Sequence, residues 1–138
     1  ADIAAILLCH FTDQFYHTDN DRIDKVSQET IKNVGTAALV SAYTLINADA
    51  DTGHRILQYT LNAATVRLNT EFALSKAAVK NGDDRKREIL ILETWGDWYL
   101  QSVQSIADVA PRDATLRQEI SDAESTLYEL MTSLMEAL

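Results

Sequence analysis

Residues 87–106, REILILETWGDWYLQSVQSI, decide the fold of this chain. The stretch holds the chain's two tryptophans and its densest apolar run, residues 89–92. At 3.6 residues per turn its apolar side chains fall on one stripe, formed by Ile89, Leu92, Trp95, Tyr99, Val103 and Ile106 and widened by Ile91 and Trp98. So broad a stripe is typical of a central helix that several neighbours cover. We therefore expect a helix here with one large buried face.

The opposite side of this helix is predicted to be polar. Its members recur at the same helical spacing, and they are Lys86, Leu90, Glu93, Asp97, Gln101, Gln104 and Asp108. Leu90 is the one large apolar residue that the pattern predicts to be exposed. Glu93 and Asp97 form an i, i+4 carboxylate pair, which can serve acid–base chemistry when it is buried. Within a regular polar stripe, a solvated face is the better interpretation, and such a face can also meet a partner.

The rest of the chain also has helical periodicity. Helices are predicted at about residues 2–16, 21–47, 52–80 and 113–137, joined by short polar breaks. Four glycines and one proline are too few for the turns of a sheet protein. We expect an all-α fold, an up-down bundle of four long helices plus a shorter N-terminal helix, in a single domain over residues 1–138.

Several residues mark the predicted helix ends. Asp51 or Thr52 is expected to cap the helix at 52–80, and Asp83 or Asp84 the one after it, because a side-chain oxygen there accepts from free backbone amides. Asn81-Gly82 forms a C-cap pair, and Pro111 ends the central helix.

Two faces of these helices are expected to be buried. In the helix at 21–47 the face comprises Ile31, Val34, Ala38, Leu39, Ala42, Tyr43, Leu45 and Ile46, and its alanines indicate a close neighbour helix. The last helix has a heptad seam of Leu116, Ile120, Ala123, Leu127, Leu130, Leu134 and Ala137.

Charge restricts the classes of partner. The net charge is −9, and residues 88–138 hold ten acidic residues against Arg112 and Arg117, a balance of −8. This balance argues against nucleic-acid binding through this half, since phosphate contacts need Lys and Arg. No apolar run approaches the roughly 20 residues of a membrane span. The compartment is open: a cytoplasmic protein and an exported one without its signal peptide both fit. The single cysteine, Cys9, is expected to be a small buried hydrophobe.

One basic cluster stands out at the predicted turn between the third and fourth helices. It includes Lys80, Arg85, Lys86 and Arg87. Such a cluster can bind an acidic partner or a phosphate. Cations near a helix C-terminus also complement the helix dipole without any partner, and this alternative is left open.

A metal site is the most specific chemical candidate. His10, Asp13 and His17 share one face of the predicted first helix, and imidazole with carboxylate can bind a transition metal such as zinc. One or two ligands from another helix would be needed. No ExxH or CxxC pattern accompanies the three residues, so a hydrogen-bonded or solvated histidine is the competing interpretation.

The sequence contains no catalytic constellation, and we expect no enzyme. The main hypothesis is a small acidic helical protein that acts through protein–protein interaction, as an inhibitor, immunity-type protein, chaperone-like partner or adaptor. Such a protein can also form a homodimer. A metal- or cofactor-binding bundle using His10, Asp13 and His17 is the first alternative. The second is a carrier of an apolar small molecule, with Phe72, Trp95, Trp98 and Tyr99 around the pocket.

Overall fold

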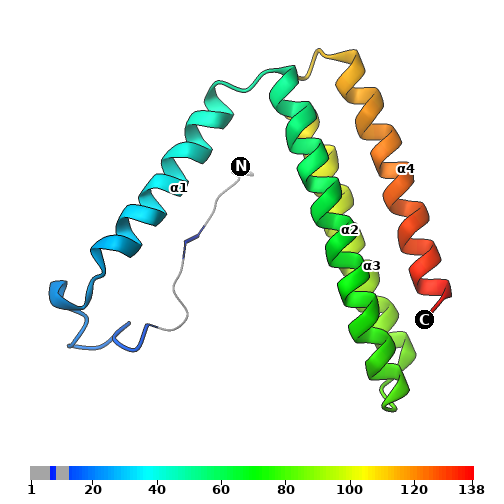
Figure 1. Cartoon of the computed structure of the whole chain (residues 1–138), viewed down its shortest axis with the longest axis horizontal. Coiled ribbons are helices and arrows are strands. Elements are labelled where there is room, and N and C mark those ends of the chain that lie inside the picture. The colour runs from blue at the N-terminus through cyan, green and yellow to red at the C-terminus, as the bar shows by residue number, and fades with distance from the viewer. Residues whose placement is uncertain (1–6, 9–12) are drawn as a thin grey trace. The chain divides into compact units, whose positions relative to one another are not determined.

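A computed structural model describes residues 7–8 and 13–138 of the chain, which divides into two units, 1–47 and 48–138. The described residues form helices and no strands (Figure 1). In order these are the short helix η1 (Ile23–Lys25), α1 (Gln28–Ile46), α2 (Ala50–Lys80), α3 (Arg85–Ser105), the short helix η2 (Ile106–Asp108) and α4 (Ala114–Glu136). The predicted all-α class is confirmed. The single-domain organisation stays a prediction.

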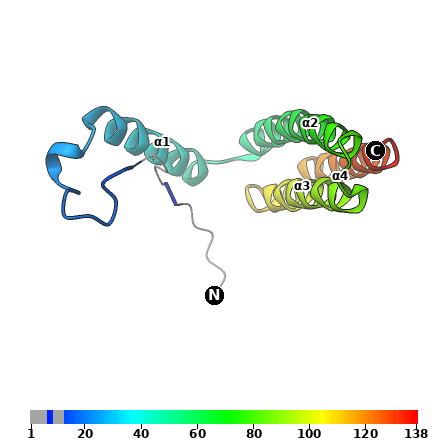
Figure 2. The ribbon, with the colours of Figure 1, turned by 90° about the horizontal axis from the view of Figure 1, so that it is seen from below.

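Residues 48–138 form a bundle in which α2, α3 and α4 lie side by side (Figure 2). Each helix contributes apolar side chains at helical spacing to one core. Its buried members are Leu57, Ala64, Leu68, Val103, Ile106, Leu116, Ile120, Ala123, Leu127, Met131 and Leu134. Most of the predicted seam of α4 is therefore buried, although Leu130 is only partly covered and Ala137 is exposed. None of the helices in the described residues is long and apolar enough to cross a membrane.

Side-chain caps set the helix starts in this bundle. Asp49 Oδ1 accepts from the Thr52 amide at 2.9 Å and from the Thr52 hydroxyl at 2.7 Å, and these bonds hold the pKa of Asp49 below its usual value. α2 therefore begins at Ala50, and the predicted caps Asp51 and Thr52 lie inside it. Asp84 caps α3, as predicted.

Two glycines allow close helix packing. A Cβ on Gly96 of α3 would lie 2.2 Å from Met131 Sδ of α4, and one on Gly53 of α2 would lie 2.6 Å from Leu116 Cδ2. Both glycines are buried. The missing side chains let α4 approach its neighbours, which helical periodicity alone does not reveal.

The unit at residues 1–47 departs from the predicted helices. Most of the helix expected at 2–16 lies outside the described residues, but its described end, 13–16, is bends and turns. Asp13 Oδ1 accepts from the Phe15 amide at 2.8 Å, and the Thr18 amide donates to the Phe15 carbonyl at 2.9 Å. These local bonds compete with helical ones and turn the chain.

α1 is shorter than predicted and its apolar face is not covered. The helix starts at Gln28, where Ser27 Oγ accepts from the Thr30 amide, and not at residue 21. None of its residues is buried: Leu39 is 71 % exposed and Ile46 82 %. The expected buried face is therefore not formed within residues 1–47, and the predicted bundle of four long helices and a short one is not matched in detail.

Candidate protein interface

The outward stripe of α3 exposes large apolar side chains. Leu90 is 60 % exposed, as predicted, while Trp98, which we expected to widen the buried face, is 56 % exposed. Arg87 and Thr94 complete the stripe at spacings of three and four residues, and both are exposed. Trp98 turns outward because the inward positions of α3 are occupied by Leu92, Gly96 and Val103, which face the other helices.

A hollow of about 430 Å³ adjoins this stripe. Its walls are almost entirely apolar and belong to Arg87, Leu90, Ile91, Thr94 and Trp95. The hollow is therefore formed within α3, by two successive turns and the indole of Trp95. A space of this size fits one large apolar side chain of a partner.

Trp95 is held in place from α2. The guanidinium carbon of Arg67 lies 3.8 Å from the centre of the Trp95 ring, and Arg67 also pairs with Glu71 at 2.7 Å. On the other side, Trp95 and Trp98 meet edge to face with ring centres 6.3 Å apart, and Trp98 meets Tyr99 in the same way at 4.8 Å. These contacts fix the aromatic rings before any partner binds.

Two carboxylates border the stripe. Glu93 and Asp97 are exposed and follow the side of α3 away from Trp95. Burial, which an acid–base pair requires, is missing at both positions. The arrangement instead places negative charge beside an exposed apolar surface.

The residues of the predicted basic cluster have different contacts and positions in the structure. The guanidinium of Arg85 donates to the Met135 carbonyl at 3.3 Å, so that it neutralises the C-terminal end of α4. Lys80 is the last residue of α2, and Lys86 is exposed in the first turn of α3. Arg87 is the member of this cluster that lines the hollow.

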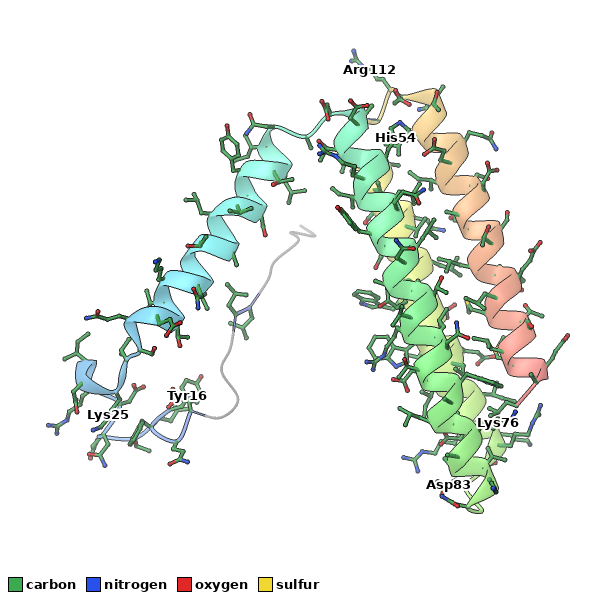
Figure 3. The ribbon with its side chains drawn as sticks, in the orientation of Figure 1. Tyr16, Lys25, His54, Lys76, Asp83 and Arg112 are labelled. Atoms are coloured by element: carbon green, nitrogen blue, oxygen red, sulfur yellow. The ribbon has the colours of Figure 1, made fainter. Side chains whose placement is uncertain are left out.

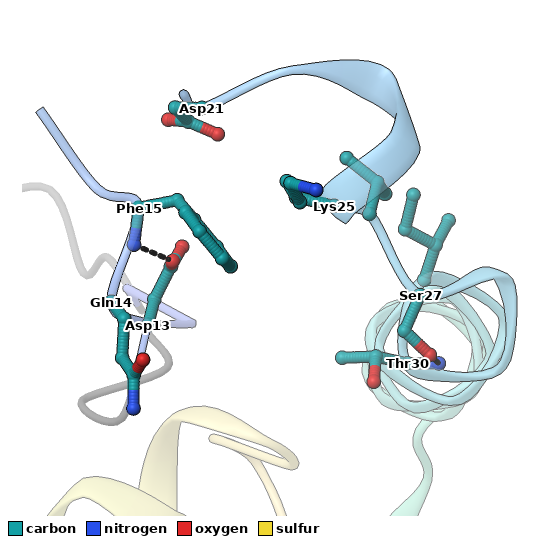
Figure 4. A pocket seen from close by; sticks show the side chains of 9 residues that line it. Asp13, Gln14, Phe15, Asp21, Lys25, Ser27 and Thr30 are labelled. Atoms are coloured by element: carbon teal, nitrogen blue, oxygen red, sulfur yellow. Dashed lines mark hydrogen bonds between the residues drawn. The ribbon is translucent and has the colours of Figure 1, made fainter. Parts of the chain in front are cut away.

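The proposed metal ligands lie partly outside the described residues. His10 is not described, so the metal site stays a prediction. Asp13 lines an open hollow of about 360 Å³ near the start of α1, where its carboxylate is bonded to the Phe15 amide and Lys25 lies 5.4 Å from the Phe15 ring centre (Figure 4). His17 has a φ of 62° and stacks beside Tyr16. Over residues 7–8 and 13–138, no three His, Cys, Asp or Glu side chains gather around one point.

The predicted carrier pocket is not seen as one space around its four aromatic residues. Phe72, Trp95 and Tyr99 pack against the core, and Trp98 is exposed. Of these four, the hollow beside α3 includes Trp95 alone. Binding of an apolar small molecule stays a prediction.

Sequence reasoning missed an ion pair between α2 and α4. His54 Nδ1 lies 2.6 Å from Glu119 Oε2, at the end of the bundle where His54 is marked in Figure 3. The hydrogen bond to the Glu119 carboxylate raises the pKa of His54 above its usual 6.5, and the carboxylates of Asp113 and Asp51 add to the effect. The two residues are 65 positions apart, so no local pattern could have paired them.

Comparison of the chain with protein families, curated proteins and solved structures finds no match. The surface of α3 is therefore interpreted from its own geometry.

Proposed function

We propose that this protein acts by binding another protein through the outward stripe of α3. The observation that supports this most directly is the 56 % exposure of Trp98 beside a preformed apolar hollow. Tryptophan and arginine are the residue types most enriched among the side chains that dominate binding energy at interfaces. Here Trp98 and Arg87 lie on the same stripe, with Leu90 between them.

The rigidity of the surface favours binding over simple exposure. Arg67 packs on the Trp95 ring, and Trp95, Trp98 and Tyr99 contact one another. Binding of a partner therefore costs little side-chain entropy at these aromatic residues. An isolated exposed hydrophobic residue needs no explanation, but Leu90 lines the hollow and Trp98 lies on the same stripe, so the exposed apolar residues are grouped.

The charges around the stripe indicate the chemistry of the partner. Glu93 and Asp97 lie along one border, and the chain carries a net charge of −9. A partner segment with one large apolar side chain, flanked by Lys or Arg, would fill the hollow and meet these carboxylates. Arg87 at the end of the hollow would in addition donate hydrogen bonds to one carboxylate of the partner.

A displayed library of helical peptides, selected against the full chain, tests the proposal. We expect selected peptides to carry an apolar residue flanked by basic ones, and their binding to be lost in Trp98→Ala and Leu90→Asp. Tyr128→Ala is the matched control, because Tyr128 of α4 is an equally prominent aromatic residue at 65 % exposure. Circular dichroism would confirm that all three variants are folded. Equal loss of binding in Tyr128→Ala and Trp98→Ala, or no selected peptide, would refute the proposal.

A further inference from the structure

α1 presents an apolar arc that covers about half of its circumference. Apart from Gln28 and Lys32 near the helix start, the arc contains only apolar residues, namely Ile31, Val34, Gly35, Ala38, Leu39, Ala42, Tyr43, Leu45 and Ile46. No residue of α1 is buried. The large members of the arc are strongly exposed, among them Leu39 at 71 % and Ile46 at 82 %.

The near absence of charge on α1 makes this helix suited to self-association. The chain has a net charge of −9, and residues 88–138 carry −8 of it, so two copies repel one another through that part of the chain. In α1, Glu29 and Lys32 balance, and residues 33–48 contain no charged side chain. Two copies can therefore meet along α1 without bringing like charges together. A strongly charged partner would find no charged side chain at residues 33–48 with which to form an ion pair.

The spacing of the arc is symmetric about Ala38. Its central seam consists of Ile31, Val34, Ala38, Ala42 and Leu45, with intervals of three, four, four and three residues. A seam with this symmetry matches itself when a second copy runs antiparallel about a two-fold axis at Ala38. Ile31 then lies opposite Leu45, Val34 opposite Ala42, and Ala38 opposite Ala38.

The residue sizes fit such a pair. The large side chains meet at the ends of the seam, and the small ones at its centre let the two backbones approach closely. The opposed helix dipoles favour the antiparallel arrangement. We infer that a second copy of this chain covers α1, forming an antiparallel homodimer centred on Ala38. This surface lies in the other unit from the stripe of α3, so the two proposals stand or fall separately.

A matched pair of variants of the full chain tests the dimer. Ala38→Glu would place two carboxylates opposite each other at the two-fold axis. Ala37→Glu makes the same chemical change one residue away, on the polar side of α1 among Asn33, Ser41 and Thr44. Light scattering after size exclusion and sedimentation velocity should give the mass of a dimer for the wild type and Ala37→Glu, and of a monomer for Ala38→Glu. Circular dichroism should show equal helix content in all three.

Two further experiments test the register. An equimolar mixture of Ala38→Glu and Ala38→Lys should restore the dimer, because the opposite charges now face each other. On a Cys9→Ser background, Ala38→Cys should form an intermolecular disulfide under mild oxidation and Ala37→Cys should not. A monomeric wild type, or a dimer that survives Ala38→Glu, overturns the proposal. A mixture that stays monomeric, or equal cross-linking at both positions, overturns the antiparallel register.

Discussion

The guanidinium of Arg67 stacks over the indole of Trp95, with 3.8 Å between the guanidinium carbon and the ring centre. The contact joins α2 to α3 beside the surface that we propose for partner binding. Glu71, one turn further along α2, accepts from the same guanidinium at 2.7 Å and keeps it aligned with the ring. Arginine is thus held between a carboxylate and an aromatic face.

Removing this stack should weaken the bundle measurably. We expect Arg67→Ala to lower the free energy of unfolding by about 1–2 kcal/mol, the range of a partly desolvated cation–π contact. Denaturant unfolding of Arg67→Ala, Trp95→Leu and the double variant gives the coupling between the two residues, because leucine removes the aromatic face. Arg55→Ala removes an exposed cation from the same helix and serves as control. Strictly additive effects of the two substitutions would show that the stack contributes nothing.

The two tryptophans should differ in their contribution to stability. Trp95 packs against the core, so Trp95→Ala is expected to cost about 3 kcal/mol of unfolding free energy. Trp98 is 56 % exposed, so Trp98→Ala should cost about 1 kcal/mol or less. Thermal and denaturant melts of both variants provide the comparison. If Trp98→Ala proved the more damaging of the two, the outward position of this indole would be incorrect.

Gly96 should be sensitive to the smallest side chain. A methyl group there would lie 2.2 Å from Met131 Sδ, so Met131 must move, and Gly96→Ala should destabilise the bundle by about 1–3 kcal/mol despite the better helix propensity of alanine. In a Met131→Ala background the same substitution should be neutral or stabilising. A double-mutant cycle from urea unfolding measures this reversal. The same loss in both backgrounds would mean that the two residues are not in contact.

Stability should depend on pH through His54. Because its pKa is raised in the folded protein, the pair with Glu119 contributes stability that is fully present below the unfolded pKa of about 6.5 and is lost as the pH rises through the folded value. The urea midpoint of the wild type should therefore decrease as the pH is raised from about 6.5 through the folded pKa of His54. His54→Gln and Glu119→Gln should remove that fall.

Glu124→Gln provides the control for this titration. Glu124 accepts from the neutral amide of Gln104 at 2.6 Å and pairs with no histidine in the described part of the chain, so its removal should leave the pH dependence near neutrality unchanged. A wild-type midpoint that did not change across this range would show that the 2.6 Å contact between His54 and Glu119 is absent in solution.

The sequence by itself determined the helices of residues 48–138 and most of their core. The period of 3.6 residues placed Leu92, Val103, Leu116, Ile120 and Leu127 inside, and all five are buried. The cap at Asp84 and the C-terminal pair Asn81-Gly82 were also predictable. Periodicity and capping are local properties, because each depends on residues within one or two helical turns.

The tertiary structure alone decided which predicted faces were covered. The apolar face of α1 and the indole of Trp98 both follow helical spacing, yet both are exposed. Local patterning states that a face is apolar, but burial requires a neighbour that arrives from elsewhere in the chain or from another molecule. The pairing of Arg67 with Trp95 and of His54 with Glu119 has the same origin. These residues lie on different helices, and only packing brings them together.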